Sequence, residues 1–147
     1  MSVTGLATFD KSLQTIHSWL NELEDDLGWA DKHKTFQGLR VVLHALRDRL
    51  SVEQATKLAA QFPVLLAGFY YENWQPSDKP IKTRHKEAFL AEIQSELEDV
   101  GPDIDAEQVV RAVFKLVAHR VSAGEVDDVK NMFPKHLKAL WPVAVPS

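Results

Sequence analysis

The sequence predicts an all-α fold, in which two tandem repeats of about four helices pack as one bundle around a pseudo-twofold axis. Apolar residues recur at intervals of three and four, which is the spacing of an amphipathic helix. The chain also aligns with itself at an almost constant offset, and no segment alternates apolar and polar residues as a half-buried strand does. Two repeats are too few for an open solenoid, so a closed pair is expected.

The internal repeat is clearest around residues 39–50, LRVVLHALRDRL. With an offset of 71 residues, this segment aligns without a gap with residues 110–121, and Arg49 meets Arg120. Upstream the offset is 70, because the loop between the first two helices is one residue longer in the second copy. Other aligned pairs are apolar in both copies: Trp19 with Phe89, Leu23 with Ile93, Phe62 with Phe133, and Leu66 with Leu137.

The first two helices are predicted from their apolar stripes and caps. Apolar side chains at positions 9, 13, 16, 20, 23 and 27 form one helical stripe, and Gly28 can end that helix in a left-handed conformation. Asp31 can cap the second helix, which contains residues 39–50. Its apolar face consists of Leu39, Val42, Leu43, Leu46 and Leu50. The residues expected on its solvent side are Arg40, His44, Arg47 and Asp48.

Each repeat is predicted to continue with a short third helix and a fourth helix. Ser51 and Ser122 begin segments that fit a capping box at the start of the third helix. Pro63 and Pro134 suit the first turn of the fourth helix, where a missing N–H costs nothing. In the first repeat the fourth helix runs through PVLLAGFYYENW and is apolar nearly all round, which is typical of burial on more than one side.

The chain, residues 1–147, is predicted to be a single all-α domain. Residues 75–83, QPSDKPIKT, contain two prolines and no periodicity, so they form the predicted linker. The linker separates repeats at about residues 9–74 and 84–142.

Composition excludes several classes of protein. The formal net charge of -4 argues against a nucleic-acid binder, which requires a basic face. The chain has no cysteine, and therefore no disulfide or cysteine-based metal site. No apolar run approaches the ~20 residues of a membrane span, and the first residues lack the features of a secretory signal. A cytoplasmic protein without a membrane or nucleic-acid partner is expected.

Three segments, LRVVLHALRDRL, FPVLLAGFYYENW and KTRHKEAFLAEI, carry a resemblance to a known family. The chain resembles the bacterial family catalogued as domain of unknown function 2267, over about residues 8–142. The combination of residues 43–50 with residues 70–74 is the most specific part of this likeness. The resemblance implies the helical fold and a bacterial, cytosolic origin. It brings no activity and no catalytic or ligand residues, so it leaves the function open.

The sequence predicts no metal, cofactor or catalytic residue, and favours a protein that is not an enzyme. Among the six histidines, no two lie four residues apart, which is the usual spacing of a helical metal pair. His44 and Asp48 have that spacing, but on the predicted solvent side of their helix. The acidic run at residues 22–26 is interpreted as a solvated face, and no phosphate-binding or nucleophile motif occurs.

Four residues are candidates for ligand binding: Arg49, Arg120, Tyr71 and Trp74. The two arginines fall on the edges of apolar faces, where a guanidinium group must meet carboxylates or carbonyls. They are interpreted either as an anion-binding pair or, preferably, as two internal ion pairs, each within its own half. Tyr71 and Trp74 have the amphipathic character of binding surfaces, which is equally typical of a helix end that closes a core. For Tyr70 a core position is expected.

Two functions fit these observations. The first is a non-catalytic protein-interaction or self-association module, with a protein partner or a second copy in a homodimer. The alternative is a binding protein or enzyme for a small anionic molecule, with its pocket between the two repeats.

The two copies differ on the fourth helix, where Val64, Leu65 and Ala67 align with Lys135, His136 and Lys138. The apolar side in the first half requires a cover, which either the second repeat or a partner chain in an isologous dimer could supply. We expect the first-half helix to be a central packing element and its counterpart to lie on the surface.

Overall fold

The computed structural model describes residues 3–82 and 85–142, and within these ranges every regular element is a helix. The first half contains α1 (Ala7–Leu27), α2 (Lys32–Asp48), α3 (Val52–Ala59) and α4 (Val64–Tyr70), followed by the short 3₁₀ helix η1 (Pro76–Asp78). The second half contains α5 (Lys86–Leu97), α6 (Ala106–Arg120), α7 (Ala123–Asn131) and α8 (Lys135–Lys138). The all-α prediction is confirmed for the described residues.

The predicted caps explain where several helices begin and end. Gly28 ends α1 with a φ of 71°, in the left-handed region that favours glycine. The Asp31 side chain accepts a hydrogen bond from the Lys34 N–H at the start of α2. Ser51 and Ser122 cap α3 and α7 in the same way. The fourth helix of the first half is shorter than predicted, because α4 ends at Tyr70.

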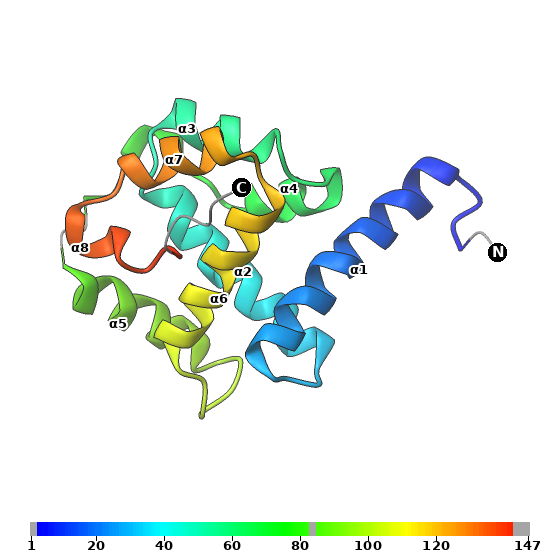
Figure 1. The fold of residues 1–147 in the computed structure, drawn as a ribbon, viewed down its shortest axis with the longest axis horizontal. Coiled ribbons are helices and arrows are strands. Elements are labelled where there is room, and N and C mark those ends of the chain that lie inside the picture. Colours follow the sequence, from blue (N-terminus) through cyan, green and yellow to red (C-terminus); the bar gives the residue numbers. More distant parts are fainter. Residues whose placement is uncertain (1–2, 83–84, 143–147) are drawn as a thin grey trace.

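Helices α2 and α6 contact each other at the centre and are flanked by the remaining helices (Figure 1). Helix α1 packs on α2, α4 and α6, whereas α5 packs on α2 and α6, and α3 packs on α7. The apolar faces of α2 and α6 meet in the core. Eight residues of these faces are at most 1% exposed: Leu39, Val42, Leu43, Leu46, Val110, Val113, Phe114 and Val117. Buried residues from every α helix join one apolar cluster.

Helix α4 is not the central packing element that the sequence predicts. Its Leu66 and Tyr70 are fully buried, but Val64 is 84% exposed and Leu65 is 37% exposed. Helices α2 and α6 take the central places, and α4 packs mainly on α1 and α2. The second half therefore does not cover the apolar outer side of α4. On α8, Lys135 and His136 are exposed, as expected.

The start of α1 extends away from the body of the molecule (Figure 1). Its first buried residue is Ile16, so the preceding residues, 7–15, contribute no buried side chain. The sequence placed Phe9 and Leu13 on the same core-facing stripe as Ile16, but they are 58% and 39% exposed. No helix among the described residues is both long enough and apolar enough to cross a membrane.

Candidate functional site

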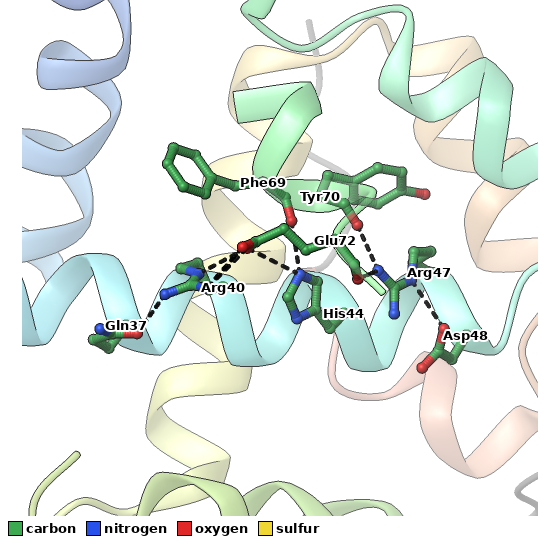
Figure 2. A network of polar contacts seen from close by, with 8 residues as sticks. All are labelled: Gln37, Arg40, His44, Arg47, Asp48, Phe69, Tyr70 and Glu72. Atoms are coloured by element: carbon green, nitrogen blue, oxygen red, sulfur yellow. Dashed lines mark hydrogen bonds and ion pairs between the residues drawn. The ribbon is translucent and has the colours of Figure 1, made fainter. Parts of the chain in front are cut away.

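A network of polar side chains joins the outer face of α2 to the end of α4 (Figure 2). Arg40 donates hydrogen bonds from Nη2 to both carboxylate oxygens of Glu72, at 2.8 and 3.0 Å. His44 Nε2 donates to the Phe69 carbonyl at 2.7 Å. Arg47 Nη1 donates to the carbonyls of Tyr70 and Glu72, at 2.7 and 2.6 Å. The last carbonyls of a helix have no partner within it, so this network caps the carboxyl end of α4.

The prediction that Arg40, His44, Arg47 and Asp48 face solvent is wrong for Arg47, and the other three side chains are only partly exposed. Arg47 is only 4% exposed, and His44 is half-buried. A helical projection correctly turns these residues away from the face that meets α6. It does not show that α4, a later segment, packs against the same side of α2.

Burial changes the acid–base behaviour of His44. Loss of hydration lowers the pKa of His44 below its ordinary 6.5, and the nearby guanidinium groups of Arg47 and Arg40 act in the same direction. The hydrogen bond to Phe69 and the charge of Glu72 oppose this shift without reversing it. His44 is therefore held in its neutral form, with the proton on Nε2 that the Phe69 carbonyl requires.

We expect acidification to weaken the fold through His44. Because its pKa is lower in the folded state than the ordinary 6.5, the unfolded chain takes up the proton more readily. The stabilisation is complete above about pH 6.5 and is lost as the pH falls through the lowered folded-state pKa. As the pH is lowered from about 8 to about 5.5, the denaturation midpoint of the wild type should fall towards that of His44→Gln, because the variant has no titrating ring. A midpoint of the wild type that rises relative to that of the variant at low pH would contradict this assignment.

Arg49 links the end of α2 to α5 of the other half. Its side chain is 3% exposed, and its Nη2 donates to the Glu92 carboxylate. Nη1 donates to the Ala45 carbonyl at 3.1 Å, and the guanidinium lies 5.0 Å from the centre of the Phe89 ring. Nε is buried and has no acceptor among the described residues.

Arg120 links the end of α6 to α1 in a similar way. Its Nε donates to the Glu22 carboxylate at 2.9 Å, and its Nη2 donates to the Ser18 hydroxyl at 3.0 Å. The guanidinium lies 5.9 Å from the centre of the Trp19 ring. The expectation that each arginine finds its partner within its own half is therefore wrong for both carboxylates, and holds only for the hydrogen bond from Arg49 to the Ala45 carbonyl. The reason is that α5 lies against α2, and α1 lies against α6.

Tyr71 and Trp74 lie just beyond α4, and neither belongs to the contacts of Arg49 or Arg120 described above. Both are half-buried, and their rings are 5.5 Å apart. The Tyr71 ring also meets Tyr70, which is fully buried as expected and donates from its hydroxyl to the Ala55 carbonyl at 2.9 Å. The four candidate ligand residues thus occupy three separate places: α2 with α5, α6 with α1, and the segment after α4.

Two hollows contain charged side chains. A cavity of about 220 Å³ is lined by Arg49 and Lys82 together with Pro80, Ile81, Met132, Phe133 and Pro134. A hollow of about 630 Å³ between α1 and α6 is lined by three acidic residues, by Lys115 and His119, and by the apolar residues Leu23, Ala112 and Leu116. Lys115 pairs there with Asp26, and His119 pairs with Glu22. Within residues 3–82 and 85–142, no three histidine or acidic side chains gather as a metal site.

The third feature is an apolar groove between the start of α1 and the start of α4. The groove is about 330 Å³ in volume and is lined by Thr4, Phe9, Ser12, Leu13, Val64 and Leu65. Two more exposed apolar residues stand next to this lining in the chain: Val3 precedes Thr4, and Leu6 precedes Phe9 by about one helical turn. We call the six apolar residues Val3, Leu6, Phe9, Leu13, Val64 and Leu65 the N-terminal patch.

The N-terminal patch gathers most of the exposed large apolar side chains. Of the nine that are exposed within the described residues, six belong to the patch; the others are Val52, Ile81 and Met132. The sequence contained a signal for this. At an offset of 70, Lys86, the first residue of α5, aligns with Ile16, so α1 has nine residues that α5 lacks. The patch uses Phe9 and Leu13 from this extension.

The helical fold and the exposed patch define a small all-α protein that displays an apolar surface outside its core. The sequence model of the family described as "Uncharacterized conserved protein (DUF2267)" matches residues 16–140. The chain belongs to this family, as its resemblance indicated. Comparison with curated proteins gives no match.

Proposed function

We propose that the protein is a non-catalytic protein-interaction module whose binding surface is the N-terminal patch. The observation that carries this proposal is a groove lined by four exposed apolar residues, with the exposed Val3 and Leu6 beside them in the chain. Monomeric soluble proteins rarely expose a contiguous apolar patch larger than a few hundred Å², and a larger patch marks an interaction site. The patch is built on helices, which present it as a preformed surface.

The proposal includes a two-repeat bundle with a pseudo-twofold axis, in which residues 75–83 join repeats at about 9–74 and 84–142. Residues 83, 84 and 143–147 lie outside the described part of the chain. The reciprocal ion pairs support this arrangement, because Arg49 with Glu92 and Arg120 with Glu22 are related by the same offsets of 71 and 70 as the sequence. The aromatic rings under the two guanidinium groups are related in the same way.

We also infer a bacterial, cytoplasmic protein that does not bind nucleic acid. The family resemblance supports the source, the lack of cysteine fits a reducing compartment, and the net charge of -4 disfavours binding to phosphates.

The alternative function, binding of a small anionic molecule, has one supporting observation. The buried Nε of Arg49 has no acceptor within residues 3–82 and 85–142, and Arg49 lines the cavity of about 220 Å³. The other two guanidinium nitrogens, however, already bond Ala45 and Glu92. We favour the interaction module, because its surface has no cover among the described residues, whereas the Arg49 charge is already paired.

We expect photo-crosslinking in cells to trap a protein partner at the patch. The photoreactive residue p-benzoylphenylalanine would replace Val64, whose 84% exposure makes the change harmless to the core. The matched control is the same replacement at Val52, which is 44% exposed and lies outside the patch. The expected result is a discrete protein adduct from position 64 and none from position 52. Equal labelling from both positions, or from neither, would contradict the proposed function.

A further inference from the structure

We propose that the partner is a second copy of this chain, an inference that rests on the proposed function of the patch. In the isologous dimer, the projecting start of α1 from each copy lies in the groove between α1 and α4 of the other. Phe9 and Leu13 supply the inserted ridge, and Val64 and Leu65 supply the opposite wall of the groove.

The first argument is the lack of a cover from within the chain. Surface positions at the start of α8 carry Lys135 and His136, as an exposed helix normally does. The aligned positions on α4 are Val64 and Leu65, and the second half leaves them exposed. An apolar side that is exposed in the single chain is stabilised when another molecule covers it.

The second argument is shape. A twofold contact uses the same patch on both molecules, so the patch must be complementary to itself. This patch combines a helix whose start projects from the body (Figure 1) with an adjacent groove, about 330 Å³ in volume. Such a surface offers both an insert and a place for the insert, which an isologous dimer requires.

The third argument is charge. A twofold axis brings identical groups close together, so a charged patch would repel its own copy. None of the six residues that line the groove is charged. Of its two polar residues, Thr4 already donates its hydroxyl to the Asp10 carboxylate at 2.8 Å. A highly charged partner would find no ion-pair partner in the groove, whereas a second apolar patch matches it.

The fourth argument is area. With roughly 150–200 Å² for a fully exposed large apolar residue, the patch exposes on the order of 600 Å² per copy. Covering it on both copies removes about 1,200 Å² from water, which is the lower end for a specific interface. We therefore expect a reversible dimer that dissociates on dilution.

The test is sedimentation equilibrium of the purified protein over about 10 μM to 1 mM. Wild type should shift from the chain mass of 16.6 kDa towards twice that mass as the concentration rises. Phe9→Glu and Val64→Glu should each weaken the dimer at least tenfold, because they place like charges around the twofold axis. The control is Val52→Glu, which changes an exposed valine outside the patch. This variant should dimerise as the wild type does. Equal thermal midpoints of all four proteins at a dilution where the wild type is monomeric would establish that the variants are folded.

Two results would overturn self-association through this patch. One is a wild type that stays at 16.6 kDa at every concentration, and the other is a dimer that both patch variants preserve. The cellular crosslinking from position 64 then separates the two proposals. Adducts with other proteins would leave the patch as an interaction surface for a different partner, whereas no adduct at all would overturn the proposed function as well.

Discussion

Arg47→Ala should lower the free energy of unfolding by about 3 kcal/mol, a large part of the stability of a small domain. The guanidinium of Arg47 is buried and holds the carbonyls of Tyr70 and Glu72 at the end of α4. Hydrogen bonds to a charged group contribute about 1.5–3 kcal/mol each, and removal of the donor leaves buried carbonyls without a partner. The substitution also frees α4 from α2, so the end of α4 should fray.

The matched control is Arg40→Ala on the same face of α2. The Arg40 side chain is 28% exposed and its partner Glu72 is 33% exposed, so solvent screens this pair. We expect a loss of less than about 1 kcal/mol there. Arg47→Lys should fall between the two, because an ammonium group keeps the charge but has no second nitrogen to replace the Nε donor that bonds Asp48. Urea denaturation would measure all three, and equal midpoints for Arg47→Ala and Arg40→Ala would refute the capping role of Arg47.

Arg49→Ala should lower the free energy of unfolding by roughly 2 kcal/mol, within the range for the loss of charge-assisted hydrogen bonds. Its side chain is 3% exposed, whereas Glu92 is 54% exposed, so burial of the arginine and its packing on Phe89 contribute more than the ion pair itself. Arg120→Ala should cost about half as much, because the Arg120 side chain is 26% exposed.

A double-mutant cycle of Arg49→Ala with Glu92→Ala tests whether the two side chains interact across the halves. A coupling energy of about 0.5–1 kcal/mol is expected for a pair with one exposed partner. An unchanged denaturation midpoint for Arg49→Ala would overturn the structural role. It would return Arg49 to the ligand-binding alternative.

Local patterns were sufficient to predict the helices and most of the core. Caps such as Gly28 and Asp31 act through backbone groups within a few residues, so their effect is readable without tertiary structure. The apolar face of α2 follows from helical geometry alone, and the structure buries it. The family could likewise be identified from the sequence, because it depends on the residues themselves.

The candidate sites depended on which segments meet. Arg47 and Arg49 are two residues apart, and helical projection placed one in solvent and the other at a core edge. In the structure both are buried, since α4 folds back over one side of α2 and α5 covers another. Phe9 continues the stripe of Ile16, yet it is exposed because the start of α1 projects from the body of the molecule.

The sequence by itself determined the helical elements, their caps, the apolar faces of α2 and α6, and the family of the protein. Only the tertiary structure decided that Arg49 and Arg120 bond carboxylates of the opposite half, that Arg47 caps α4, and that Phe9 and Val64 share one exposed groove. The physical reason is range. Helix periodicity and capping act over a few residues along the chain, whereas burial and ion pairing depend on segments that are tens of residues apart and meet only when the helices pack.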